Sequence, residues 1–174
     1  MDRTIRTDGR QSDGELSDLL QALFSIELMH PSAVVTLVSA WVSDVNVIDN
    51  RDGSFAGLNL PTRQIRLPEV LGRLAESGAN VFVACNEDVH NQLFAEILKE
   101  EARRRGCLER VHVRVTANLH IKGLATDSFH LAGSMNFTHN GINVLGEEVT
   151  LRLDFDEVER AQIEYHGLYF AGME

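Results

Sequence analysis

Apolar residues recur at helical spacing soon after the start of the chain. Residues 1–11 are polar and aperiodic, and the segment Ser12–Glu15 then has the spacing of a helix capping box. One helical face follows, formed by Leu16, Leu19, Leu20, Leu23 and Phe24. This pattern predicts a helix that runs to about His30 and stops before Pro31. We therefore expect a flexible N-terminus at residues 1–11 and a single domain at residues 12–174.

The rest of the chain alternates between strand-like and helix-like patterns. Apolar runs and alternating positions predict strands at 33–42, 80–84, 111–115, 119–127, 129–132 and 149–153. Amphipathic periodicity predicts further helices at 67–77, 88–105 and 157–170. Strands that alternate with helices are typical of an α/β layered domain, in which helices flank a mixed β-sheet.

Residues 43–66 show no clear period and contain several glycine, proline, aspartate and asparagine residues. A connection of this length is unusual in a compact domain unless it is a functional loop. Its three arginines, Arg51, Arg63 and Arg66, either reach a substrate or are solvated loop charges. Trp41 and Asp44, at the end of the first predicted strand and just beyond it, could line a substrate pocket, and the alternative for Trp41 is a simple packing role.

Composition and charge exclude several classes of protein. The 174 residues are 44% hydrophobic and 24% charged, which is ordinary for a globular chain, and no apolar run approaches the ~20 residues that cross a bilayer. The N-terminus lacks the apolar segment of a secretory signal, so we expect a cytoplasmic location without a membrane partner. The net charge of −10 excludes a uniformly basic nucleic-acid coat, but it does not exclude a small local anion site. Cys85 and Cys107 are expected to be buried free thiols.

The segments His120–Asp127 and Gly133–Thr138 carry the most informative chemistry. His120 and Lys122 lie two residues apart, which places them on one face of a strand. Burying both on an apolar strand costs free energy unless they meet an anion or a partner. Ser134 and Asn136, also two apart, would add a hydroxyl and an amide, and the four groups together could bind a phosphate beside a nucleophile. The alternative is a hydrogen-bonded core histidine with a surface lysine.

The spacing as a whole resembles the His-x-Lys-x4-Asp…Gly-Ser-x-Asn signature of the phospholipase D superfamily. The matching positions are His120, Lys122, Asp127, Gly133, Ser134 and Asn136, and the trailing Phe137-Thr138 is also similar. Five residues separate the aspartate from the glycine, where six are common. The family places a glutamate shortly downstream, for which Glu148 fits best and Glu147 is the alternative; Gly146 stands where the family's preceding asparagine is usual. The resemblance implies a phospholipase D-like layered domain.

The resemblance also implies a mechanism. His120 would attack phosphorus and form a phosphohistidine, and a second, protonated histidine would donate a proton to the leaving oxygen and then activate water. Lys122 and Asn136 would hold the non-bridging oxygens with help from Ser134, and Glu148 would fix the histidine tautomer. Asp127 would support the nearby turn. Neither a metal nor another cofactor is needed for this chemistry.

The chain carries one such motif, whereas a two-histidine site needs two. We therefore expect a homodimer whose motifs meet at the two-fold axis, or a partner chain that supplies the second motif. The expected activity is a nuclease-like phosphodiesterase that acts on DNA or RNA. A DNA-binding subunit of a larger defence or DNA-modification complex is the first alternative, and a lipid phosphodiesterase is the second. Thr138 and His139 are expected near the mouth of the site.

Overall fold

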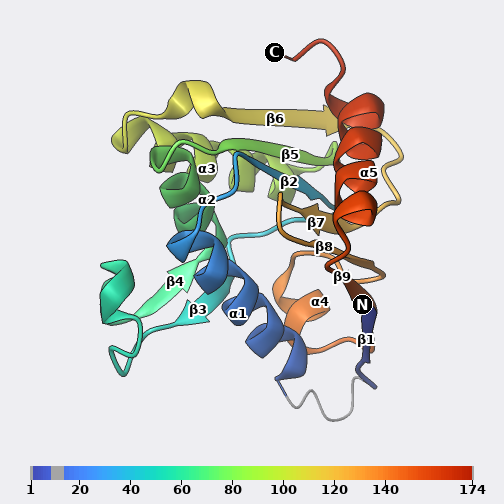
Figure 1. The fold of residues 1–174 in the computed structure, drawn as a ribbon. Coiled ribbons are helices and arrows are strands. Elements are labelled where there is room, and N and C mark those ends of the chain that lie inside the picture. The colour runs from blue at the N-terminus through green and yellow to red at the C-terminus, as the bar shows by residue number, and fades with distance from the viewer. Residues whose placement is uncertain (1, 9–13, 174) are drawn as a thin grey trace.

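A mixed seven-stranded β-sheet runs through the molecule, with helices packed on both of its faces (Figure 1). The computed structural model describes residues 2–8 and 14–173. Across the sheet, the strands are β1 (Asp2–Arg6), β9 (Glu148–Arg152), β8 (His130–Gly133), β7 (Gly123–Ala125), β2 (Val34–Val38), β5 (Asn80–Asn86) and β6 (Val111–Thr116). This architecture confirms the α/β prediction.

Three parallel strands, β2, β5 and β6, form one half of the sheet, and the strands from β7 to β1 extend it in antiparallel fashion. Their valine-rich sequences suit a pleated sheet that is covered on both faces. Because β2, β5 and β6 run the same way, their carboxyl ends meet at one edge of the sheet. The chain segments that leave this edge contain most of the predicted site residues.

The helices are α1 (Glu15–Met29), α2 (Leu67–Glu76), α3 (Val89–Arg104), α4 (His139–Asn143) and α5 (Phe155–Tyr165), and α5 continues into a π-helical turn at His166–Phe170. Helices α1, α2 and α3 share a core with one face of the sheet, which includes Leu37 of β2. The neighbouring Val38 points to the opposite face, where it packs with Tyr165 of α5. This alternation along one strand separates the two cores.

Helix starts agree with the sequence pattern where the structure describes them. Asp88 caps α3 by accepting a hydrogen bond from the backbone of His90, and Asp154 caps α5 in the same way. Gly14 is the residue that precedes α1, with a left-handed backbone (φ 74°) and no side-chain cap. Ser12, the predicted capping residue, lies outside the described residues.

Two segments without a clear periodicity contain strands, which corrects the expectation of a flexible N-terminus for Asp2–Arg6. Asp2–Arg6, expected to be flexible, pairs with β9 as an edge strand because its backbone completes the ladder that β9 would otherwise leave open. The segment 43–66, which shows no clear period in the sequence, contains a hairpin of β3 (Asn46–Asp49) and β4 (Gln64–Arg66) with a short 3-10 turn at Ala56–Leu58. In both segments the strands are too short for periodicity to reveal them.

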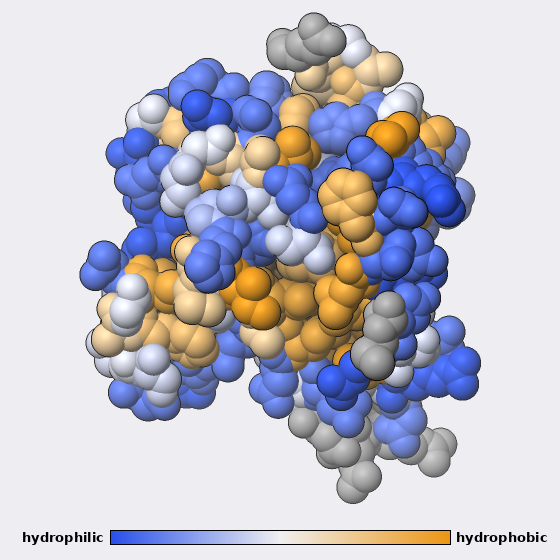
Figure 2. All heavy atoms as spheres, in the orientation of Figure 1, coloured by the Kyte–Doolittle hydropathy of each residue, from blue (hydrophilic) through white to orange (hydrophobic). Residues whose placement is uncertain are grey.

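Figure 2 shows hydrophilic residues around the margin of one face and apolar residues gathered near its middle. Cys85 and Cys107 are buried and free, as predicted. Among the residues that the structure describes, no helix has both the length and the apolar character needed to cross a bilayer.

Candidate active site

His120 lies in the segment that leaves β6 at the carboxyl edge of the parallel strands. Asn118 turns the chain there with a left-handed backbone (φ 60°), a conformation that asparagine tolerates better than most residues. At the end of β5, Asn86 then holds Leu119: its Oδ1 accepts from the Leu119 backbone N–H at 2.7 Å, and its Nδ2 donates to the Leu119 carbonyl at 3.3 Å. This double hydrogen bond fixes the residue directly before His120. No pattern in the sequence indicates this role of Asn86.

His120 and Lys122 do not lie on a strand, which corrects the prediction of a strand over residues 119–127. Strand β7 begins only at Gly123, and His120 is exposed while Lys122 is half-buried. The reason is the turn at Asn118, which leaves residues 119–122 without a regular strand partner. Lys122 Nζ donates to the carbonyl of His120 at 2.9 Å, so its ammonium stays beside the imidazole-bearing residue.

A backbone hydrogen bond brings the two halves of the motif together. The N–H of Gly133 donates to the carbonyl of Lys122 at 3.2 Å, and Ser134 follows directly. Gly133 cannot carry a side chain here, because a Cβ would lie 2.0 Å from the carbonyl oxygen of Glu148. The β7–β8 hairpin thus forms with the spacing that is one residue shorter than usual, and the backbone just before Ser134 lies beside that of Lys122.

The amide of Asn136 is held by the segment that leaves β2. Its Oδ1 accepts from the backbone N–H of Trp41 at 3.2 Å and lies 3.4 Å from Ser39 Oγ. Ser39, fully buried, donates to the Trp41 carbonyl at 2.7 Å and accepts from the Phe137 N–H at 3.3 Å. With its oxygen engaged, the group that Asn136 can offer a ligand is its NH₂, a donor suited to a phosphate oxygen.

The segment from Ala40 to Val42 is fixed from its other side by Asn91 of α3. This fully buried side chain accepts from the Val42 N–H at 2.8 Å and donates to the Ala40 carbonyl at 2.8 Å. Sequence reasoning missed Ser39 and Asn91 as positioning residues, because only the fold brings them to the backbone groups that they satisfy.

The two candidate glutamates have different environments. Glu147 is buried and accepts a short hydrogen bond from Ser134 Oγ, while its backbone is paired with Thr7 just beyond β1. Glu148 is exposed, and its carboxylate pairs with Arg6 on β1. The role of Glu148 in orienting the histidine stays a prediction: its carboxylate pairs with Arg6, whereas that of Glu147 contacts the motif hydroxyl of Ser134.

Asp127 lies at the opposite end of β7 from Lys122. Its carboxylate accepts from the Ala33 N–H at 2.6 Å, and its own N–H donates to Ser32 Oγ at 3.1 Å. These contacts tie the β7–β8 turn to the start of β2. Among the described residues, Asp127 thus contacts the scaffold and not the groups around His120.

Three of the candidate substrate-binding residues lie in an ion-pair network. Asp44, Arg63 and Arg66 form a network with Glu69: Arg66 pairs with Asp44 at 2.6 Å and with Glu69 at 3.2 Å, and Arg63 pairs with Glu69 at 3.0 Å. Burial raises the pKa of Glu69, but the hydrogen bonds from Arg63 and Arg66 outweigh it and hold the pKa below its ordinary value. These arginines are paired with acids and are not free for an anion.

Thr138 and His139 begin the short helix α4, which follows Asn136 directly. Thr138 Oγ1 accepts from the Gly141 N–H at 3.1 Å, the contact of an N-cap residue. Gly141 allows α4 to approach Asn136 closely, because a Cβ would lie 2.3 Å from the Asn136 carbonyl oxygen. Thr138 therefore serves the helix start, while His139 is exposed beside it.

Two other histidines serve the second core and not the motif. Burial is the main cause that lowers the pKa of His130 to about 4, with Arg152 adding to the effect, and its Nε2 lies 2.9 Å from Tyr165 Oη. His166 contacts the ring of Phe82, and burial lowers its pKa also. Neither imidazole is exposed in the way that His120 is.

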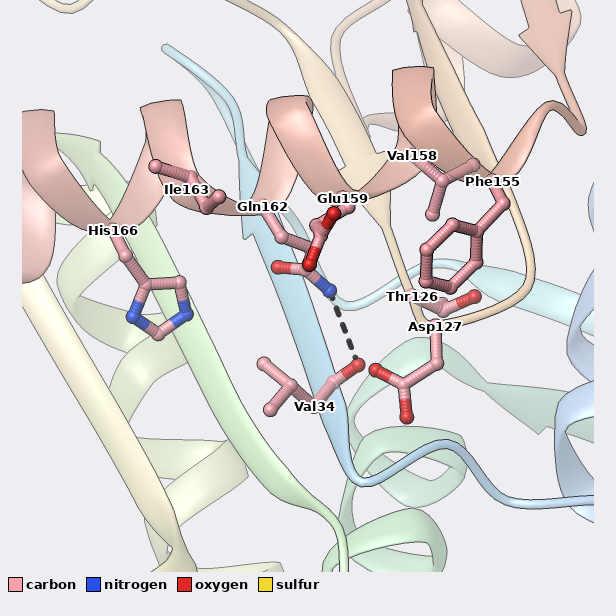
Figure 3. Close-up of a pocket in the computed structure, with 9 residues that line it drawn as sticks. All are labelled: Val34, Thr126, Asp127, Phe155, Val158, Glu159, Gln162, Ile163 and His166. Atoms are coloured by element: carbon pink, nitrogen blue, oxygen red, sulfur yellow. Dashed lines mark hydrogen bonds between the residues drawn. The ribbon is translucent and has the colours of Figure 1, made fainter.

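A pocket of about 400 Å³ lies between α5 and the start of β2 (Figure 3). Phe155, Val158 and Ile163 provide its apolar lining, and Gln162 donates to the carbonyl of Val34 at 3.3 Å. Asp127 is the one motif residue that lines it. The pocket is at the opposite end of β2 from the segment that holds Asn136, so it is not the site of the motif chemistry.

The site offers an exposed imidazole, an ammonium, a hydroxyl bonded to a buried carboxylate, and an amide NH₂. This set can bind an anionic oxygen and provide a nucleophile beside it. Among residues 2–8 and 14–173, no group of three or more histidine, cysteine, aspartate or glutamate side chains is arranged to hold a metal ion.

Comparison with solved structures identifies the fold. Nuc from Salmonella typhimurium, a phospholipase D family member, superposes with a TM-score of 0.58 over 95% of this chain and 90% of its own, at 11% sequence identity. The chain thus has a fold similar to that of this phospholipase D family member. NucT from Helicobacter pylori gives a TM-score of 0.53 at 14% identity, covering 96% of this chain and 94% of that one.

The phospholipase D fold also matches parts of larger proteins. Polyphosphate kinase from Porphyromonas gingivalis gives a TM-score of 0.61 at 14% identity over 95% of this chain, which spans only 25% of the kinase. No protein-family model matches the sequence, and no curated protein matches it. The comparisons therefore establish the fold, and the function has to be argued from the site.

Proposed function

We propose that this chain is a metal-independent phosphodiesterase that cleaves nucleic acid through a phosphohistidine. The observation that carries the proposal is the continuity of the motif at the carboxyl edge of the sheet. Hydrogen bonds link His120 to Lys122, Lys122 to Gly133, and Ser134 to Glu147. The similarity of the fold to Nuc and NucT supports phosphodiester chemistry on this scaffold.

In the proposed reaction, neutral His120 attacks phosphorus, and a second histidine protonates the leaving oxygen. Lys122 and the NH₂ of Asn136 stabilise the charge on the non-bridging oxygens. We assign the orientation of the imidazole to Glu147 in place of Glu148. Support comes from the burial of Glu147 against Ser134, whereas Glu148 is engaged by Arg6.

The second histidine is proposed to come from a second copy of the chain. Each copy carries one motif, and an exposed His120 can approach its equivalent across a two-fold axis. Light scattering at micromolar concentration tests this assembly. A strict monomer with full activity would contradict it.

The activity is tested on single-stranded DNA, RNA, duplex DNA and bis-p-nitrophenyl phosphate, with a chelator present throughout. Turnover is expected with chelator, and His120→Ala should abolish it. The matched control is His30→Ala, which removes another exposed imidazole at the end of α1. Activity that the chelator abolishes, or that survives in His120→Ala, would refute the proposal. DNA retention in a gel shift without cleavage would favour a binding subunit, and hydrolysis of liposomes alone would favour a lipid enzyme.

A further inference from the structure

Trp41, the one tryptophan of the chain, is exposed at the edge of the motif. Its side chain is 45% exposed, although tryptophan is a large aromatic residue that usually buries most of its surface. Its backbone N–H lies 3.2 Å from Asn136 Oδ1, so the indole is attached directly beside an amide proposed to hold phosphate. In the described part of the chain, no aromatic ring pairs with the indole.

The backbone that carries this indole is unusually well fixed. Ser39 donates to the Trp41 carbonyl at 2.7 Å, and Asn91 bonds to both neighbours, the Ala40 carbonyl and the Val42 N–H, each at 2.8 Å. Val42 also forms a β-bridge with Phe137, one residue beyond Asn136. An exposed ring on a rigid backbone loses little conformational entropy on binding, which suits a preorganised contact.

We propose that Trp41 is a specificity-determining residue that stacks on a nucleobase next to the scissile phosphate, and that the substrate is therefore single-stranded nucleic acid. This inference rests on the proposed function. A base within a duplex is covered by its neighbours, whereas an unpaired base offers a free face to an aromatic ring.

The charge of the protein supports a stacking contribution to binding. Affinity for a duplex comes mainly from neutralising phosphates, and a chain with a net charge of −10 is poorly suited to do so. The three arginines of the segment 43–66, which follows Trp41, are already paired with acids: Arg51 with Asp49, Arg63 with Glu69, and Arg66 with Asp44 and Glu69. Stacking on an indole supplies binding free energy that needs no further cation.

Because the chain has a single tryptophan, fluorescence reports on this residue alone. The experiment uses the full chain with His120→Ala, titrated at constant ionic strength with oligothymidylate, oligouridylate, a duplex, and an abasic phosphodiester oligomer of equal length. We expect quenching by the two single strands and little quenching by the duplex or the abasic oligomer. Preference for thymidylate or uridylate decides between DNA and RNA.

A binding assay with labelled oligomers accompanies the titration. Trp41→Ala should lower the ratio of the affinities for thymidylate and abasic oligomers by about 5- to 150-fold, which corresponds to about 1–3 kcal/mol. Trp41→Phe should restore part of this ratio, because a phenyl ring still stacks. The control is Phe155→Ala, which removes an exposed ring on α5, at the opposite end of β2, and should leave the ratio unchanged.

Several results would overturn the stacking role. They are equal quenching by abasic and thymidylate oligomers, no quenching by either, or an unchanged ratio of the two affinities in Trp41→Ala. A further such result is an indole that dimerisation buries, with an emission that oligomers do not change. These results are distinguishable from failure of the proposed function, which is the absence of chelator-resistant turnover in the protein with His120 intact. Base-dependent quenching without turnover would leave the stacking role in a binding protein.

Discussion

Replacing Gly133 with alanine tests the link between the fold and the site. The added Cβ would lie 2.0 Å from the carbonyl oxygen of Glu148 and 2.8 Å from Cα of Val149. Both are backbone atoms of the neighbouring strand β9, so no side-chain rotation can relieve the contact. The strands β8 and β9 have to separate locally, and the hydrogen bond from the Ser134 N–H to the Glu148 carbonyl, now 2.9 Å, has to lengthen.

The cost can be placed on a scale. Overpacking a well-packed interior typically costs 1–3 kcal/mol, and a contact with rigid backbone belongs at the upper end, so we expect Gly133→Ala to lose about 2–3 kcal/mol of unfolding free energy. For a chain of this size, each kcal/mol shifts Tm by about 2–4 °C, which gives a fall of about 4–12 °C. Phosphodiesterase activity should fall even under conditions in which the variant is fully folded, because Ser134 and Glu147 move with the strands.

Urea unfolding and thermal melting measure the loss. The matched control is Gly57→Ala in the 3-10 turn, where an added Cβ meets no atom within 4 Å. If the unfolding free energies of Gly133→Ala and the control agree to within about 0.5 kcal/mol, the close packing of β8 on β9 does not constrain the site and the reasoning fails.

Three further predictions concern hydrogen-bonded groups. The pKa of His130 is lowered from 6.5 to about 4, so only the unfolded chain takes up this proton between those pH values. The unfolding free energy should therefore fall as the pH drops from about 6.5 to 4, by on the order of 2–3 kcal/mol from this residue. His130→Gln should flatten that slope in urea titrations. Glu147→Gln should reduce kcat at least tenfold, because it changes the carboxylate that accepts from Ser134. Glu148→Gln removes only the exposed pair with Arg6, so it should lower the unfolding free energy by less than about 1 kcal/mol and leave kcat unchanged. Equal kcat values for the two variants would contradict our assignment. Ser39→Ala should lower the unfolding free energy by about 1 kcal/mol and raise KM for oligonucleotides more than it lowers kcat. Steady-state kinetics tests this role, because KM would not change more than kcat if the hydroxyl served only stability.

The strongly periodic elements could be predicted from the sequence. The helices α1, α2, α3 and α5 and the strands β2, β5, β6 and β9 have amphipathic or β-branched patterns, and each lies where the pattern put it to within a few residues. The strand at Asp2–Arg6 and the hairpin in residues 43–66 could not be found this way. Their few residues pair with distant backbone, and a strand stabilised by backbone hydrogen bonds leaves little mark on side-chain pattern.

The candidate site was predicted in its chemistry but not in its geometry. The motif residues His120, Lys122, Ser134 and Asn136 stood out by residue type and spacing. The residues that hold this region in place could not be recognised in the sequence. Asn86 lies far from Leu119 in the chain, and Asn91 lies far from Trp41. A single asparagine in a sequence does not show with which backbone group it will form a hydrogen bond.

The sequence by itself determined which elements form, that they make an α/β layered domain, and which residue types can handle a phosphodiester. These follow from local preferences and periodic burial, which act over a few residues at a time. Only the tertiary structure decided that the carboxylate of Glu147 contacts Ser134 while that of Glu148 pairs with Arg6. It also decided that Arg63 and Arg66 are paired with acids, and that the amide oxygen of Asn136 is engaged by Trp41. The physical reason is that hydrogen bonds and ion pairs act over a few ångströms, and which groups come that close is decided when the strands take their order and register in the sheet.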